Sequence, residues 1–208
     1  MAESFAIRGN ICYTLPTPAE GTKMIAGGTI AVVGSGASAI TTLHMLRQRC
    51  EKSGGTAQVV WITRRAGAPY ELIENDPLPQ RAELHKLGNE LAAAAADPAG
   101  AGFQVDHRGG CHVVSLERTE DDGVVIELEL SDGGERTTVA AASVVAHVGY
   151  RPDASLTSEL QVHYCYATEG PMKLAGAMMA AGGGGGDCLA QVSPGPATVS
   201  AHARPTAT

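Results

Sequence analysis

The stretch IAVVGSGASAITTLHML, Ile30–Leu46, constrains the fold of this chain more than any other. Four apolar residues lead into the turn Gly34-Ser35-Gly36, and an amphipathic segment follows at once. A continuous apolar run suits a strand that is buried on both faces of a parallel sheet. After the turn, apolar residues recur at steps of three and four, which is typical of a helix. The stretch therefore predicts a strand, a glycine turn and a helix in direct succession.

The turn fits the pattern GxGxxG/A, which occurs where a strand–helix turn holds a dinucleotide. We expect Gly34 to allow a tight exit from the strand, Gly36 to let a pyrophosphate approach the backbone, and Ala39 to keep the helix close to the sheet. A turn of this pattern can also be purely structural, but its place between a buried strand and an amphipathic helix favours a phosphate site. The predicted cofactor-binding residues of the turn are Gly34, Ser35, Gly36, Ala37, Ser38 and Ala39.

A second apolar run, Ala57–Thr63, completes a right-handed strand–helix–strand unit. It ends in Thr63-Arg64-Arg65, where a site for NAD usually carries an acid that binds the ribose hydroxyls. A guanidinium can instead bind a 2′-phosphate through two hydrogen bonds. Two surface arginines can also be no more than a solvated strand end. We interpret Thr63, Arg64 and Arg65 as cofactor-binding residues that favour NADPH.

The rest of the chain predicts an α/β fold. A helix is expected from Gln80 to about Ala96, followed by a third parallel strand at GFQVDH. Three strand-like runs then follow, CHVVSLER, GVVIELEL and RTTVAAASVVAHVG, with Asp-Gly steps between them that favour hairpins. We expect a Rossmann-like parallel sheet with helices on both faces, an antiparallel β-meander as a crossover, and a return strand at Ser143–Val148.

The predicted organisation has four parts. They are an irregular lead (1–28), an NAD(P)-binding Rossmann-like domain (29–153), a partly helical extension (154–181) and a flexible or disordered tail (182–208) that contains a run of glycines.

Charge and cysteine content indicate the environment. The formal charge of −7 and a pI near 5.4 leave no electrostatic footprint for nucleic acid or an anionic membrane surface. No leader-like or membrane-spanning apolar run occurs. The five cysteines are widely and irregularly spaced, so we expect reduced thiols and a cytoplasmic location.

Together these motifs resemble the NADPH-binding domain of pyridine nucleotide-disulfide oxidoreductase-like flavoproteins, including the thioredoxin reductase group. The resemblance covers the glycine turn, the arginines, the third strand, the meander and the segment Gly149-Tyr150-Arg151-Pro152-Asp153. It adds Gly149 to the expected cofactor-binding residues. His147 stands where such proteins usually have a small or hydroxyl residue. The segments Thr168–Leu174 and Gly185–Leu189 are similar to parts of uncharacterised FAD/NAD(P)-binding oxidoreductases.

The resemblance implies a role in hydride transfer from NADPH to FAD. Such flavoproteins carry a glycine-rich fingerprint for FAD near their N-terminus, and this sequence does not contain it. We therefore expect FAD only if another chain or partner supplies it. The chain thus looks like a part of a flavoprotein. The first alternative is a catalytically incomplete nucleotide-binding remnant or subunit, and a weaker one is a methyltransferase that uses S-adenosylmethionine, which the arginines oppose. We assign no catalytic acid or base, because the cofactors would carry the chemistry.

Two other groups of residues were considered as sites. His107, Cys111 and His112, or His163 with Cys165, lack the four compact ligands of structural zinc, so we expect no metal. Ser35 and Ser38 lie inside the glycine turn without the sequence context of a nucleophile, so we expect them to act as caps or backbone contacts.

Overall fold

The computed structural model describes residues 9–67, 69–70, 78–94, 102–150, 153–160, 162–165 and 169–180. The chain forms two compact units, Met1–Gly149 and Tyr150–Thr208. The expected flexible tail (182–208), the segment Gly185–Leu189 and the pair Arg151-Pro152 lie outside the described residues.

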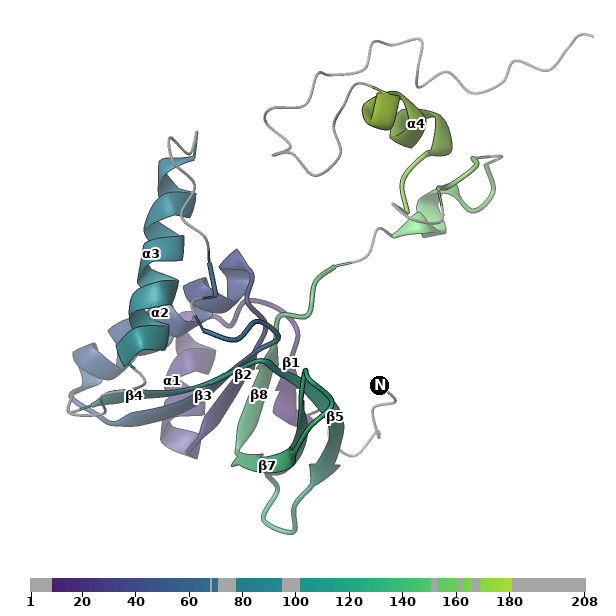
Figure 1. Ribbon diagram of the computed structural model, residues 1–208. Coiled ribbons are helices and arrows are strands. Elements are labelled where there is room, and N and C mark those ends of the chain that lie inside the picture. Colours follow the sequence, from purple (N-terminus) through teal and green to yellow (C-terminus); the bar gives the residue numbers. More distant parts are fainter. Residues whose placement is uncertain are drawn as a thin grey trace, which may run out of the picture. The chain divides into compact units, whose positions relative to one another are not determined.

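The first unit is built on a parallel sheet (Figure 1). Its strands, in spatial order, are β1 (Ile11–Cys12), β8 (Ser143–Ala146), β2 (Ile30–Val33), β3 (Ala57–Thr63) and β4 (Phe103–Gly109). Every neighbouring pair in this sheet is parallel. Three helices connect or precede the strands: α1 (Pro18–Gly27), α2 (Ala37–Ser53) and α3 (Pro79–Ala94). The sequence-based prediction of a Rossmann-like α/β fold is therefore confirmed.

An antiparallel meander connects β4 to β8, as predicted. It consists of β5 (Cys111–Arg118), β6 (Val124–Leu130) and β7 (Arg136–Ala141). Asp122 and Gly133 adopt left-handed backbone conformations in the two hairpins, with φ of 66° and 76°. Asp and Gly tolerate this conformation better than other residues, which explains why the Asp-Gly steps marked both turns.

The two faces of the parallel sheet bury different partners. On one face, Ile30, Val32 and Trp61 pack with buried residues of α2 and α3 and partly buried residues of α1. On the other face, Ala31 and Val60 pack against the meander. The meander contributes the buried residues Cys111, Val124, Ile126, Leu128 and Ala141. The expectation of helices on both faces is wrong in this detail, because the apolar face of the meander covers the second face and the described helices of this unit share the first.

The segment expected to be an irregular lead contains regular structure, so that expectation is wrong for its described part. α1 begins with a capping box: the Thr17 hydroxyl accepts a hydrogen bond from the Glu20 backbone N–H, and the Glu20 carboxylate accepts one from the Thr17 N–H. The bond from the Thr17 N–H, and one from the Thr17 hydroxyl to the same carboxylate, lower the pKa of Glu20. Pro18 stands in the first helical turn, where its missing N–H costs nothing. The Pro and Gly residues of this segment indicated a loop, whereas the capping box marks the start of a helix.

The second unit is described by itself and only in part. Its 3₁₀ helix, Ala154–Thr157, begins where the Asp153 carboxylate accepts a hydrogen bond from the Ser155 N–H. The Ser155 side chain and this backbone bond lower the pKa of Asp153. The helix α4 spans Met172–Ala180, in the region of expected helical composition. Among the described residues of the chain, no helix combines the length and the apolar character needed to cross a membrane.

Ile126 tests the packing between the two sheets. Its side chain is fully buried under the parallel sheet, so Ile126→Ala should leave a cavity and lower the free energy of unfolding by about 2–5 kcal/mol. Urea denaturation measures this change. The exposed Thr137 on β7 provides the control, and Thr137→Ser should change stability by no more than about 0.5 kcal/mol. Similar losses for the two variants would contradict the assigned core.

Candidate functional site

The candidate site lies at the carboxyl edge of the parallel sheet. The Gly34 N–H donates to the Ile62 carbonyl of β3 at 3.0 Å, and the His147 N–H donates to the Val33 carbonyl of β2 at 2.8 Å. The glycine turn therefore emerges between the ends of β3 and β8, the strands on either side of β2. At this position the order of strands reverses, and in open α/β sheets such a switch point is where ligands bind.

Gly34 is required by the fold itself. Its φ is +123°, and a Cβ atom at this position would lie 2.2 Å from the His147 carbonyl oxygen. A side chain would therefore meet both backbone strain and a steric clash with backbone. This close approach lets β2 turn sharply into α2 while remaining paired on both sides.

Gly36 has a different role. A Cβ atom on Gly36 would meet none of the described atoms within 4 Å, and its φ of −78° suits any residue. Packing therefore does not require glycine at Gly36, and its missing side chain leaves the start of α2 open. Ala39, in contrast, is fully buried against the sheet, as close packing of helix and sheet requires.

The start of α2 offers several unpaired donors. Within the described part of the chain, the backbone N–H groups of Gly36, Ala37 and Ser38 have no hydrogen-bond acceptor. The first turn of α2 contains no acidic residue, and no side chain caps the helix. Free N–H groups together with the positive end of the helix dipole favour an anion. Anion binding by this helix start stays a prediction of the sequence.

Two aromatic side chains that the sequence did not single out support the turn. The Trp61 indole N–H donates to the Gly34 carbonyl at 2.8 Å. The Tyr70 hydroxyl donates to the carbonyls of Ser35 and Gly36. Neither contact leaves a signal in a single sequence, because both join residues that lie far apart along the chain.

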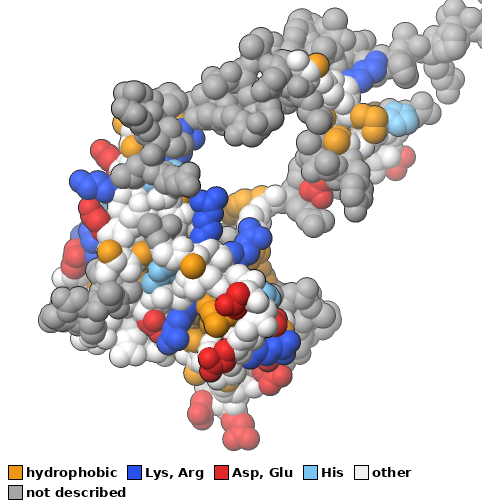
Figure 2. Space-filling model, viewed as in Figure 1, with side chains coloured by type: hydrophobic (Ala, Val, Ile, Leu, Met, Phe, Trp, Pro, Cys, Tyr) orange, Lys and Arg blue, Asp and Glu red, His pale blue; other side chains and the backbone are white. Residues whose placement is uncertain are grey.

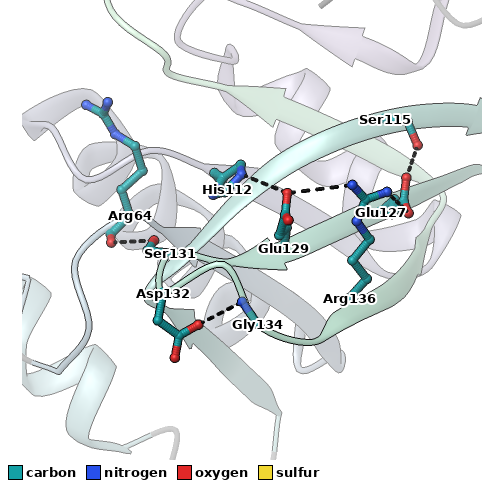
Figure 3. A network of polar contacts seen from close by, with 9 residues as sticks. All are labelled: Arg64, His112, Ser115, Glu127, Glu129, Ser131, Asp132, Gly134 and Arg136. Carbon is teal, nitrogen blue, oxygen red and sulfur yellow. Dashed lines mark hydrogen bonds and ion pairs between the residues drawn. The ribbon is translucent and has the colours of Figure 1, made fainter.

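The two predicted arginines lie at the end of β3 with exposed side chains. The buried Thr63 hydroxyl donates to the Arg65 carbonyl at 2.9 Å and lies 2.9 Å from His107 Nε2. The Ser131 hydroxyl donates to the Arg64 carbonyl at 3.4 Å (Figure 3). Thr63 therefore positions the arginine backbone from inside the protein, while its expected contact with a cofactor stays a prediction.

The arginine side chains are available to a ligand. The Arg64 guanidinium points away from the polar network in Figure 3. Neither Arg64 nor Arg65 forms an ion pair within the described ranges of the chain. On the face that Figure 2 shows, basic and acidic side chains are interspersed. An anion at this strand end would therefore be held by local contacts of the arginines more than by a broad field.

The residues that were considered as metal ligands are used elsewhere. His107 packs against Trp61 with its ring tilted by 36°, and the ring centroids lie 4.7 Å apart. Cys111 is buried between the sheets, whereas His112 Nε2 lies 3.3 Å from Glu129 on the outer side of the meander (Figure 3). His163 and Cys165 belong to the second unit. Among the described residues, no three His, Cys, Asp or Glu side chains form a group that could hold a metal.

The outer side of the meander carries its own polar network (Figure 3). Glu127 accepts a hydrogen bond from the Ser115 hydroxyl at 2.9 Å and pairs with Arg136 at 3.1 Å. Both contacts lower the pKa of Glu127. These groups satisfy one another, so the network holds the strands together rather than forming a site.

His147 follows β8 directly beside the turn. Its Nε2 lies 2.8 Å from the Thr42 hydroxyl of α2, and its Nδ1 is buried without a hydrogen-bond partner in the described structure. Burial lowers the pKa of His147. The neutral imidazole therefore links β8 to α2. Gly149, two residues further on, is exposed and has a φ of +98°.

The comparisons with known proteins bear on the fold. No protein-family model matches the chain, and no curated protein matches its sequence. Among solved structures, the FAD-bound cadaverine monooxygenase of desferrioxamine biosynthesis from Erwinia amylovora is 16% identical with a TM-score of 0.60, covering 80% of this chain and 46% of that chain. The L-lysine 6-monooxygenase from Pseudomonas syringae is 16% identical with a TM-score of 0.54, covering 81% and 49%.

The thioredoxin reductase from Lactococcus lactis aligns less closely, with a TM-score of 0.46, 18% identity, and coverage of 78% of this chain and 46% of that chain. The two monooxygenases share the fold of this chain. The resemblance to flavoprotein oxidoreductases that the sequence indicated is therefore confirmed at the level of the fold. The chain spans about half the length of these proteins, with 46% and 49% of the two monooxygenases covered.

The two glycines of the turn should respond differently to alanine. Gly34→Ala should lower the free energy of unfolding by more than about 2 kcal/mol, because the new Cβ clashes with His147 and the positive φ is strained. Gly36→Ala should lower it by less than about 1 kcal/mol, since the added methyl meets open space. Chemical denaturation of both variants checks this prediction. Equal losses would contradict the assigned roles.

Stability should depend on pH through His147 and His107. Burial lowers the pKa of both below the ordinary 6.5, and for His107 it outweighs the opposing effect of Asp106. At a pH between the folded and unfolded pKa values, the unfolded chain binds more protons than the folded chain. The stabilisation that these two neutral imidazoles give to the folded state is therefore fully present above about pH 6.5, and it is lost as the pH falls through the folded pKa values.

Urea denaturation between about pH 7.5 and about pH 5.5 measures this dependence, before most carboxylates titrate. His147→Gln should reduce the slope of stability against pH. An identical slope in the variant would show that His147 titrates normally.

Proposed function

We propose that this chain is the NADPH-binding domain of a flavin-dependent oxidoreductase. The glycine turn carries the proposal, because its unpaired N–H groups lie at the switch point of a Rossmann-like sheet and fit a pyrophosphate. The arginine pair at the adjacent strand end fits the 2′-phosphate that distinguishes NADPH from NADH.

In this proposal the chain binds and orients the dinucleotide, and the cofactors carry out the redox chemistry. When bound, NADPH supplies a hydride from its nicotinamide. The α2 start would hold the pyrophosphate, Arg64 and Arg65 the 2′-phosphate, and Gly149 would lie beside the cofactor at the end of β8. The described residues offer no second glycine-rich turn for FAD. FAD would therefore belong to a further part of the protein or to a partner, and we assign no step to it.

The second candidate is a binding module that holds the dinucleotide without turning it over, as a remnant or subunit. The observation that favours it is that the described residues show no second glycine-rich turn for FAD. Purification of the chain with a bound yellow chromophore would contradict this second candidate, since an intact flavin site would then be present.

We further propose that the protein works in the cytoplasm, with a nicotinamide dinucleotide as its ligand and a flavin-binding partner or domain. The described cysteines, Cys12, Cys50, Cys111 and Cys165, form no disulfide bond with one another, which suits a reducing compartment.

The arginine pair provides the direct test. In calorimetric titrations, Arg64→Ala with Arg65→Ala should weaken NADPH binding by about ten- to a hundredfold, because charge-assisted hydrogen bonds to the 2′-phosphate are lost. NADH, which lacks this phosphate, should bind the variant nearly as it binds the parent chain.

The matched control removes two arginines from the meander, Arg118→Ala with Arg136→Ala, and changes the net charge equally. It should leave the preference for NADPH unchanged. Equal affinities for NADPH and NADH in the parent chain, or an unchanged preference in the arginine variant, would contradict the assignment.

A further inference from the structure

Two aromatic side chains contact the three peptide carbonyls of the glycine turn. Trp61 donates to the Gly34 carbonyl at 2.8 Å. The Tyr70 hydroxyl donates to the Ser35 carbonyl and lies 3.3 Å from the Gly36 carbonyl. The carbonyl side of the turn is thus occupied by the protein itself.

This arrangement determines the direction of the opposite groups. The peptide bonds of the turn are trans, so in each planar peptide unit the N–H points away from the C=O. The Ser35 carbonyl held by Tyr70 therefore turns the Gly36 N–H in the other direction. The Gly36 carbonyl accepts the first hydrogen bonds of α2, from the N–H groups of Ala39 and Ile40, and these bonds do the same for the Ala37 N–H. These are among the N–H groups that have no acceptor within the described residues.

The turn needs such support because glycine makes it flexible. Gly36 is exposed, has no side chain to pack, and adopts several backbone conformations at little cost. A peptide that flipped would present its carbonyl oxygen, and not its N–H, to an approaching anion. A donor on the carbonyl side opposes this flip.

Tyr70 is itself held by one face of α3. Asn89 accepts a hydrogen bond from the Tyr70 N–H at 3.1 Å and donates one to the Tyr70 carbonyl at 3.0 Å. His85 stacks on the ring, with centroids 4.5 Å apart. At Gly88 a Cβ would lie 2.7 Å from the ring, so the absence of a side chain gives the ring its place. Residues three and four apart share a helix face, and His85, Gly88 and Asn89 on this face all contact Tyr70.

The Tyr70 hydroxyl stays protonated, as a hydrogen-bond donor must. Burial raises the pKa of Tyr70 above its ordinary value of 10, so the hydroxyl keeps its proton at any physiological pH. Its contacts with the turn therefore do not switch with pH.

We infer that Tyr70 is a positioning residue that orients the peptide groups of the glycine turn toward the pyrophosphate of a dinucleotide. The inference rests on the proposed function, because it assumes that the turn binds this group. Tyr70 contacts the part of the turn that serves NADPH and NADH alike. Its effect should therefore be separable from that of the arginines, which serve the 2′-phosphate alone.

The test is Tyr70→Phe in the full chain, titrated with NADPH and with NADH. The variant keeps the ring at Gly88 and His85 and removes only the hydroxyl. We expect both dinucleotides to bind about fivefold more weakly, by equal factors, because the N–H groups are no longer held in one orientation. The thermal midpoint should change little, because the ring keeps its packing against His85 and Gly88.

Two further variants complete the experiment. Tyr164→Phe makes the same chemical change in the second unit, where the hydroxyl contacts Thr157, and should leave both affinities unchanged. Asn89→Ala keeps the Tyr70 hydroxyl but removes its backbone anchor, and should weaken both dinucleotides in the same direction.

The outcomes separate the two proposals. If the parent chain binds dinucleotide and Tyr70→Phe binds it equally well, the positioning role is wrong and the proposed function stands. If Tyr70→Phe weakens NADPH alone, Tyr70 belongs to the 2′-phosphate site and the inference is overturned. If the parent chain binds neither dinucleotide, the proposed function fails and the inference fails with it.

Discussion

The contact between Gly34 and the carbonyl of His147 is the constraint on which the site depends. A hypothetical Cβ at Gly34 lies 2.2 Å from that oxygen, so the two backbones come as close as a glycine permits. This approach keeps β8 paired with β2 up to the turn and brings α2 directly over the sheet. The free N–H groups of α2, the arginines after β3 and the imidazole after β8 all lie at this edge because the three parallel strands end there.

The local features of the fold could be predicted from the sequence because each has a strong short-range signal. The turn at Gly34 and Gly36 stands between two segments of different periodicity, and the hairpins of the meander contain Asp-Gly steps. α1 could have been found from its capping box at Thr17 and Glu20. Pro and Gly nearby were read as marks of a loop, although a proline at the start of a helix is favourable.

The tertiary contacts of the site could not be predicted in the same way. Which layer covers each face of the sheet depends on where the apolar face of the meander packs, and alternation along β2 does not say what lies opposite. Tyr70 sits in a segment without periodicity, and its partners in the turn and in α3 are distant in sequence. The spacing in the sequence pointed to the glycines and arginines, whereas packing alone revealed the aromatic donors that hold the turn.

The hairpin between β6 and β7 reaches back to the parallel sheet, where the Ser131 hydroxyl meets the Arg64 carbonyl at 3.4 Å (Figure 3). A surface loop of the second layer thus touches the backbone of a proposed specificity residue. On the proposed function, this contact makes the backbone of the arginine strand end depend on the meander as well as on the parallel sheet.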